Sequence, residues 1–402
     1  MDAAWVRDFT AASALGLGRR ETLRALETER GGLAPCRFQR TRLATYVGEV
    51  PEVDAVPIPP QLAAYNCRNN RLAQLGLSLD GFAQRARERI AALGPARVGV
   101  FMGTSTSGVL ETEAAYRLRD AHQGALPPGF EYRCTHNAFS VTDYVRRSLG
   151  ATGPAVTICT ACSASAKVFA AAARMLSAEL IDAAIVGGVD SLCLTTLYGF
   201  QSLQLTAPGP CRPFDRAREG LSISEAAAFA WLERPRRDAQ GSDILLIGSG
   251  ESSDAHHMSS PHPEGAGARR AMQAALDAAH LQPADVDYIN LHGTGTRSND
   301  AAEALAVHAL FGAQLPCSST KGATGHALGA AGALEAVICA LALQEGIMPG
   351  GLNTREPDAA LPINYLLRNH RASFARALSN SFGFGGANCA LLFARADAAR
   401  RH

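Results

Sequence analysis

The chain has 402 residues, of which 47% are hydrophobic and 19% charged, and its formal net charge is +1. This length and composition suit one large or two fused globular domains and exclude a collagen-like or disordered chain. A net charge near zero, without a block of lysine or arginine, gives no electrostatic sign of nucleic-acid binding. No signal peptide or uninterrupted membrane-spanning stretch is visible, so we expect a cytoplasmic protein whose 10 cysteines are mostly buried, reduced thiols.

Apolar runs that indicate buried strands alternate with longer Ala-rich stretches that indicate helices. This alternation favours an α/β fold. The polar segment 233–242 separates two halves, 1–237 and 238–402. The predicted elements in chain order are strands at 97–102 and 155–158, a helix at 163–180, strands at 183–187 and 243–248, a helix at 266–279, a strand at 286–291, helices at 299–310 and 327–344, and a strand at 387–393.

Cys162 lies between a predicted strand and an Ala-rich helix, in the segment TICTACSASAK. The field of a helix N-terminus favours the thiolate, and the small neighbouring side chains leave room for a bulky substrate. These features are typical of a nucleophile. On position alone, a buried inert cysteine is an equal alternative, and a redox pair with Cys159 is a second one.

His292 follows a predicted strand in the segment NLHGTGT, at the end of the strand where α/β proteins place their sites. The two glycines allow a ligand to approach the backbone, and Thr294 and Thr296 offer hydroxyl groups. A single histidine is more often structural than functional. The segment becomes informative only in combination with others.

A glycine-punctuated loop, STKGATGHALGAAGALE, carries Lys321 and His326. Either residue alone is compatible with a surface position. Together with Cys162 and His292 they form a set suited to acyl transfer, with a nucleophile, two donors for an oxyanion or enolate, and a nearby cation.

The segment NSFGFGGAN, at 380–388, predicts a flexible loop whose N–H groups can point at a site. Phe382 and Phe384 are either core anchors or movable walls of an apolar pocket.

These segments, in this order and spacing, resemble the β-ketoacyl-acyl-carrier-protein synthases of the thiolase-like fold. CRPFD at 211–215 and SSDAHHMSSPHPEGAGA at 252–268 extend the resemblance over nearly the whole chain. It is closest to the elongating Cys-His-His type, because the second position is His326 rather than asparagine. The resemblance implies two similar α/β halves that form a five-layered αβαβα core.

The resemblance also implies a decarboxylative Claisen condensation. Cys162 would hold the acyl group, with the N–H groups of Cys162 and Phe384 stabilising the oxyanion. His292 and His326 would donate to the enolate formed from a malonyl thioester, which extends the chain by two carbons. The resemblance also assigns Phe384 and Phe382 to a gate. It assigns binding of the substrate arm to Thr294, Thr296 and Ser259. It implies that Lys321 orders the site together with Glu303.

The substrates would be carried on the 4′-phosphopantetheine arm of an acyl carrier protein, with no bound cofactor. No metal is expected, since the segment containing His256, His257 and His262 is similar to a substrate-side loop of the family. The chain would be a homodimer or pair with a ketosynthase-like paralogue. Carrier proteins are acidic, so a basic patch is expected, with candidates Arg68, Arg71, Arg146, Arg147 and Arg212.

Two departures favour a specialised pathway, such as aryl-polyene or polyketide synthesis, over housekeeping fatty-acid synthesis. The N-terminus keeps only a remnant of the family's first strand, at 14–16. The stretch SISEAAA at 222–228 keeps Glu225 but lacks the usual glycines. The alternatives are a non-catalytic pathway partner, or a dithiol redox protein using Cys159 and Cys162.

Overall fold

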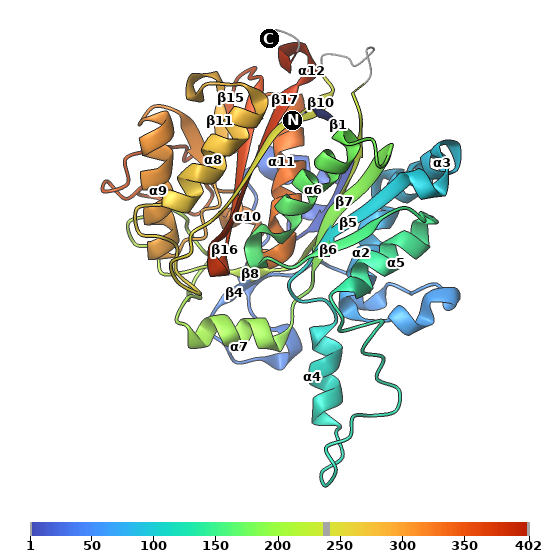
Figure 1. Ribbon diagram of the computed structural model, residues 1–402. Helices are drawn as coiled ribbons and strands as arrows, with labels where there is room; N and C mark the ends of the chain where they lie inside the picture. Colours follow the sequence, from blue (N-terminus) through green and yellow to red (C-terminus); the bar gives the residue numbers. More distant parts are fainter. Residues whose placement is uncertain (1, 236–241, 400–402) are drawn as a thin grey trace.

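A single N-terminal strand joins two β-sheets. The computed structural model describes residues 2–235 and 242–399 (Figure 1). Strand β1 (Ala4–Ser13) pairs antiparallel with β9 (Ala226–Glu233) on one side and with β10 (Ile244–Ser253) on the other. Among the described strands, those of the main sheet therefore run in the continuous order β14-β12-β11-β16-β17-β10-β1-β9-β7-β5-β6. The sequence prediction of a mere remnant in place of a first strand is wrong.

The N-terminal half of this sheet carries the nucleophile strand. Its remaining strands are β5 (Val98–Gly103), β6 (Ala155–Ile158) and β7 (Ala183–Asp190), with β6 and β7 each parallel to β5. Every residue of β9 is buried, because helices pack on both of its faces. The outer face is covered by α2 (Arg68–Ser78), α3 (Phe82–Leu93) and α5 (Phe139–Leu149).

The C-terminal half has a similar plan. Its strands are β10, β11 (Tyr288–Asn290), β12 (Pro316–Ser318), β14 (Asn364–Tyr365), β16 (Arg376–Gly383) and β17 (Ala387–Arg395). The outer layer consists of α8 (Ala266–Ala279), which packs on β10 and β17, and α9 (Arg297–Phe311), which packs on α8.

Two helices, α6 (Ala164–Ser177) and α11 (Ala331–Glu345), form the middle layer between the sheets. They approach closely, since a Cβ on Gly332 would lie 2.7 Å from the backbone N of Ala166. The segment Leu328–Glu345 has the length and hydropathy of a membrane-spanning helix, but 89% of it is buried within the protein. The five-layered αβαβα arrangement predicted from the resemblance is confirmed.

The segment predicted as a flexible loop at 380–388 is largely a β-hairpin. β16 extends to Gly383, a single 3₁₀ turn spans Phe384–Gly386, and β17 begins at Ala387. Residues 236–241, which hold most of the predicted boundary between the halves, lie outside the described residues. The division into 1–237 and 238–402 stays a prediction.

The remaining helices and strands are short. A segment that begins with α4 projects from the body beside α7 (Figure 1). The remaining elements are β2 (Gly16–Leu17), α1 (Arg19–Glu27), β3 (Ala34–Pro35), β4 (Tyr46–Gly48), α4 (Val109–Arg117), α7 (Leu194–Ser202), β8 (Ile223–Ser224), α10 (Lys321–Thr324), β13 (Ile347–Met348), β15 (His370–Arg371) and α12 (Ala396–Ala399).

Candidate active site

Cys162 sits in a 3₁₀ turn, Ala161–Ser163, between the end of β6 and the start of α6. Ala161 has a φ of 51°, the left-handed region that residues with a Cβ rarely adopt, and such local strain clusters at functional turns. The thiol is buried. The backbone N–H groups of Phe384 and of Cys162 itself are directed at its sulfur. The turn therefore presents one sulfur atom to two fixed hydrogen-bond donors.

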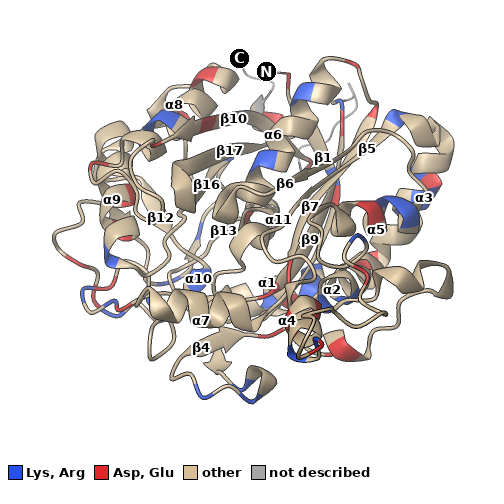
Figure 2. Ribbon diagram, turned by 60° about the horizontal axis from the view of Figure 1, so that its bottom comes forward, with Lys and Arg blue, Asp and Glu red and all other residues tan. Residues whose placement is uncertain are grey.

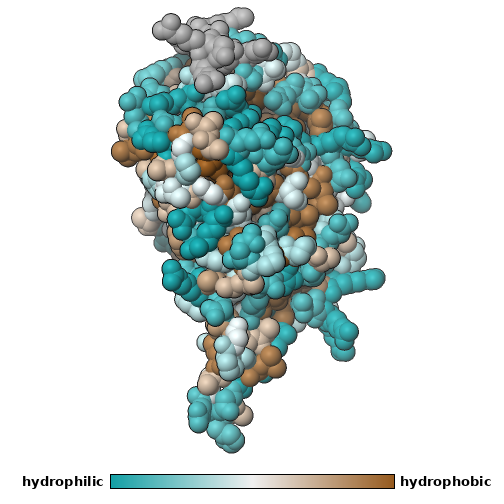
Figure 3. Space-filling model, turned by 90° about the vertical axis from the view of Figure 1, so that its right-hand side faces the viewer, coloured by the Kyte–Doolittle hydropathy of each residue, from teal (hydrophilic) through white to brown (hydrophobic). Residues whose placement is uncertain are grey.

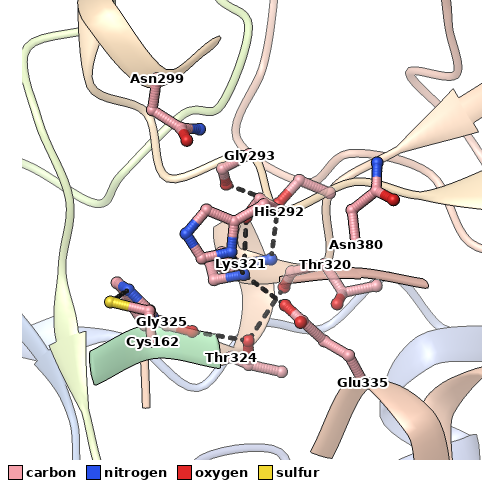
Figure 4. Close-up of polar contacts among 12 residues, drawn as sticks. Cys162, His292, Gly293, Asn299, Thr320, Lys321, Thr324, Gly325, Glu335 and Asn380 are labelled. Atoms are coloured by element: carbon pink, nitrogen blue, oxygen red, sulfur yellow. Dashed lines mark hydrogen bonds and ion pairs between the residues drawn. The ribbon is translucent and has the colours of Figure 1, made fainter. Parts of the chain in front are cut away.

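Two histidines from different loops lie close to this cysteine, and Figure 4 shows one of them, His292, beside Cys162. Nε2 of His326 lies 3.1 Å from Sγ of Cys162. The ring of His292, which follows β11, is 5.3 Å from the His326 ring and nearly perpendicular to it, at 83°. Both histidines are buried. The structure thus brings together the cysteine and the two histidines that the sequence motifs singled out.

Lys321 opens α10 and lies behind His292. Its ammonium group donates to the backbone oxygen of His292 at 2.6 Å and is 3.4 Å from His292 Nδ1. Its carboxylate partner is Glu335, on the core helix α11. The loop thus turns the lysine towards α11, and its ion-pair partner is Glu335, a residue that the sequence analysis does not name.

Glu303 supports the site in another way. Its carboxylate accepts hydrogen bonds from the backbone N–H groups of His292 and Gly293, both at 2.8 Å, and from Asn380 Nδ2 at 3.1 Å. Burial raises the pKa of Glu303 to about 7, although these donors lower it. Glu303 thus fixes the loop that carries His292.

Burial determines the protonation of the three reacting groups. It raises the pKa of the Cys162 thiol to about 11, although Lys321 and the two N–H groups oppose the shift. It also lowers the pKa values of His292 and His326 well below their usual range, and the charge of Lys321 lowers them further. The resting site at neutral pH holds a thiol and two neutral imidazoles. The thiolate expected from the helix field is not the resting form, because desolvation outweighs that field.

One cleft collects most of the predicted site residues. Only Lys321 and Glu303 lie behind its wall, whereas Cys162, His292, His326, Phe382, Phe384, Thr294, Thr296 and Ser259 line it. A larger open groove, which includes Arg212, Asn353 and Arg368, contains none of these residues.

The sequence analysis missed the apolar wall of this cleft. Phe200, from α7, has its ring 5.5 Å from that of Phe384, and Leu205 and Leu221 continue the same wall. Asn299, at the start of α9, adds a polar group to the lining. The sequence of α7, LTTLYGFQS, contains no motif that marks it as functional.

The sulfur and ring nitrogens of Cys162, His292 and His326 lie within 4.8 Å of one another, a spacing that also suits a metal ion. The ammonium of Lys321 beside His292 Nδ1 favours hydrogen-bond chemistry instead, because a divalent cation would be repelled by that charge. The absence of a metal stays a prediction. In the exposed histidine segment, His256 and His262 pack with ring centres 5.2 Å apart.

Carboxylates already bind the arginines proposed as a basic patch. Arg68 is buried and paired with Glu225 and Asp54. Asp54 also holds Arg71 at 3.5 Å, whereas Asp143 holds both Arg146 and Arg147, and Glu219 holds Arg212. Arg68 is therefore structural, and the other four are largely neutralised at the surface.

Comparison with known proteins identifies the family. The model named "Beta-ketoacyl synthase, N-terminal domain" matches residues 83–237, and the model named "Beta-ketoacyl synthase, C-terminal domain" matches residues 245–355. Nodulation protein E of Rhizobium meliloti is 35% identical over 305 residues, covering 74% of this chain and 75% of that protein. The 3-oxoacyl-acyl-carrier-protein synthase 2 of Staphylococcus aureus is 33% identical over 316 residues, covering 75% and 76%.

Solved structures agree over the whole chain. A chain from the structure of ketosynthase ApeO in complex with its chain length factor ApeC, from Xenorhabdus doucetiae, superposes with a TM-score of 0.89 at 36% identity and covers 98% of both chains. A chain of the ishigamide ketosynthase/chain length factor gives 0.87 at 27% identity and covers 98% of this chain and 99% of that one. The protein thus belongs to the β-ketoacyl synthase family and is a condensing acyltransferase.

Proposed function

We propose that Cys162 holds the growing acyl group and that His326 and His292 assist the two half-reactions of chain elongation. The observation that carries this assignment is the 3.1 Å approach of Cys162 Sγ to His326 Nε2, with two backbone N–H groups directed at the same sulfur. The reaction joins this acyl group to a malonyl unit carried on a 4′-phosphopantetheine arm and releases CO₂.

The first half-reaction transfers the acyl group to the enzyme. The Cys162 thiol gives its proton to neutral His326 Nε2 as the sulfur attacks the thioester carbonyl. The N–H groups of Cys162 and Phe384 stabilise the oxyanion. The bond from carbonyl carbon to the arm sulfur then breaks, and the departing thiolate takes the proton from His326.

The second half-reaction needs imidazole N–H groups that donate hydrogen bonds to the thioester oxygen of the malonyl unit. Lys321 next to His292 Nδ1 leaves the proton of that ring on Nε2, which donates to the malonyl thioester oxygen as CO₂ departs. His326 Nδ1 has no partner among the described residues, so its tautomer is free to change. Nε2 can then accept in the first step and donate in the second. The enolate carbon attacks the acyl carbon, the bond from this carbon to the Cys162 sulfur breaks, and the released thiolate takes up one proton from solvent.

The walls of the cleft control access. Thr294, Thr296 and Ser259 provide hydroxyl groups along the cleft for the amides of the substrate arm. The backbone N–H of Gly385 donates to the oxygen of Met258, which ties the hairpin carrying Phe384 to the segment carrying Ser259. Movement of Phe384 against Phe200 would therefore be coupled to binding of the arm.

Intact-protein mass spectrometry tests this function. The protein is offered saturated, polyunsaturated and aryl-enoyl acyl groups on a carrier protein, then malonyl carrier protein. We expect a mass gain equal to one acyl group, followed by its loss with a product two carbons longer. The Cys162→Ala variant should show no gain, because it lacks the thiol that contacts His326.

The Cys159→Ser variant is the matched control. Cys159 is exposed, and the sulfur that His326 approaches is that of Cys162, so acylation and condensation should persist. Loss of both activities in this variant would favour the dithiol alternative. Absence of acylation from every donor would contradict the assignment of Cys162.

We further infer that the chain pairs with a ketosynthase-like paralogue in a specialised pathway. The projecting segment exposes Tyr116, Leu118 and Tyr132, with 54%, 73% and 56% of their surfaces accessible, and Figure 3 shows apolar atoms on this projection. Contiguous exposed apolar groups mark interaction surfaces. The similar structures described as ketosynthases with chain length factors support a heterodimer, with a homodimer as the alternative. The cytoplasmic location stays a prediction.

Sedimentation of the purified chain, alone and co-expressed with a ketosynthase-like paralogue from the same source, measures this pairing. We expect a one-to-one heterodimer. Leu118→Asp should weaken it by about tenfold or more, because a charge would be buried in an apolar interface. A stable homodimer that does not bind the paralogue would contradict the prediction of a heterodimer.

A further inference from the structure

One short turn carries arginines that are not neutralised. Arg37, Arg40 and Arg42 lie in the stretch RFQRTR between β3 and β4, and all three side chains are exposed. Among the described residues, no carboxylate forms an ion pair with any of them. This distinguishes them from Arg71, Arg146, Arg147 and Arg212, each of which has an acidic partner. We call these three residues the arginine turn.

The fold holds the arginine turn in place. Phe38 is buried between Arg37 and Arg40 in a cluster with Leu197 and Leu221, and the guanidinium of Arg68 lies 5.2 Å from its ring centre. Gln39 and Arg40 have φ values of 49° and 58°, so the backbone makes a tight left-handed turn. A buried aromatic anchor with a tight turn around it fixes the positive charges at the surface. The backbone of the turn therefore needs little further ordering when a partner binds to the arginines.

The arginine turn and the wall of the catalytic cleft share one apolar cluster. Leu221 lines the cleft, and so does Phe200 of α7, which packs against the same cluster as Phe38. Thr45, which follows the turn, donates from Oγ1 to the backbone oxygen of Ala207 at 2.8 Å. Figure 2 shows basic residues in the turn next to β4, on the side of the molecule that also presents α7. The positive charge thus lies beside the cleft that holds Cys162.

We propose that the arginine turn is a docking surface for the acidic carrier protein, an inference that rests on the proposed function of this cleft. The carrier must stand close to the cleft, because its substrate is tethered to it by the phosphopantetheine arm. Unpaired positive groups beside the opening increase the rate of encounter with an acidic domain and orient it.

The other anionic partners fit the observations less well. A nucleic acid needs basic groups spread along an extended track, whereas these three charges fall in one turn of a chain with a net charge of +1. An anionic membrane recruits clusters of four or more basic residues, commonly beside an apolar inserting face, whereas Phe38, the apolar residue of the turn, is buried. A folded acidic protein matches the compact size of the turn.

Two parallel measurements test the proposal. The first is fluorescence anisotropy of a labelled bacterial holo-acyl carrier protein. The second is acylation of Cys162 by octanoyl carrier protein and by octanoyl-pantetheine, which lacks the carrier. The test variant is Arg37→Glu/Arg42→Glu, and Arg37→Lys/Arg42→Lys keeps the charge. Arg20→Glu/Arg24→Glu makes the same charge change on two exposed arginines of α1.

We expect the Glu variant to weaken carrier binding and to raise KM for octanoyl carrier protein by about tenfold or more, with kcat unchanged. Raising the salt concentration from about 0.05 M to about 0.3 M should weaken binding to the native protein far more than to this variant. Acylation by octanoyl-pantetheine should not change. The Lys variant and the α1 variant should bind the carrier as the native protein does.

Several results would overturn the proposal. These are equal carrier binding by native protein and Glu variant, no binding by either, or an equal loss in the α1 variant. A loss of binding to a DNA duplex or to anionic vesicles in place of the carrier would assign the turn to that partner. A Glu variant with altered oligomeric state would assign it to subunit contact. Failure of octanoyl-pantetheine to acylate the native protein would instead count against the function of Cys162, so the two hypotheses are tested separately.

Discussion

Replacement of His292 by alanine is expected to lower the rate of condensation by about 10²–10³-fold, while transfer of the acyl group to Cys162 continues. His326, and not His292, is the histidine in contact with the sulfur, so the first half-reaction keeps its proton acceptor. The second half-reaction loses the donor that Lys321 orients through Nδ1. Carbon dioxide released from malonyl carrier protein and the mass of the acyl-enzyme measure the two steps separately.

The control is His292→Gln, which keeps an N–H donor in place of the ring and should recover part of the lost rate. Glu303 still accepts from the backbone of residue 292 in both variants, so the loop should keep its position. The melting temperature checks that the fold is intact. An equal fall in acylation and condensation would contradict the division of labour between the two histidines.

The sequence predicts the helices and buried parallel strands near the site well, because these follow simple apolar patterns. It misses β1, where Arg7 and Asp8 interrupt the apolar residues. Asp8 is tolerated in this buried strand because Arg85 and Arg89 reach it from α3. An ion pair between residues this far apart in sequence cannot be read from local pattern.

Strand β9 was missed for a different reason. Its sequence, AAAFAWLE, has high helix propensity. Its position between β1 and β7, with α2 and α11 packed on its faces, imposes the extended conformation. The small alanine side chains let both helices approach the strand. Tertiary packing here overrides local propensity.

The reactive residues of the site were predictable because each stands in a distinctive segment after a strand or before a helix. Their partners were not. Glu335 lies in the apolar sequence of α11, and only the fold shows that it meets Lys321. Phe200 lies in a helix without a motif, and only the packing of α7 brings it to Phe384. Burial, which makes Cys162 a thiol at rest, is likewise a property of the assembled layers.

Replacement of Glu225 by leucine is expected to lower the free energy of unfolding by about 3–5 kcal/mol, measured by urea denaturation. The carboxylate is fully buried, pairs with Arg68 at 2.7 Å and accepts from the backbone N–H groups of Val50 and Leu192. Removal of one partner leaves the Arg68 guanidinium buried, and the exposed Asp54 is then its remaining ion-pair partner among the described residues. Breaking a buried pair in this way is strongly destabilising.

The double variant Arg68→Met/Glu225→Leu should recover a large part of this loss, since it removes both charges and fills a similar volume. The exposed pair of Arg216 and Glu356 gives the matched comparison, and Arg216→Ala should cost less than about 1 kcal/mol. If Glu225→Leu is no more destabilising than Arg216→Ala, the buried pair does not stabilise the fold.

The same variant should also lower activity, because Glu225 follows the short strand that holds His326. Ser222 O accepts from His326 N at 2.7 Å, and Ser224 N donates to His326 O at 3.0 Å. Loss of the Glu225 anchor would let this strand move. Because the strand holds His326, the 3.1 Å distance from His326 Nε2 to Cys162 Sγ would then change. Acylation should therefore fall in Glu225→Leu and return in the double variant. Glu225 in SISEAAA would then serve to position His326, a role that does not require the glycines of that stretch.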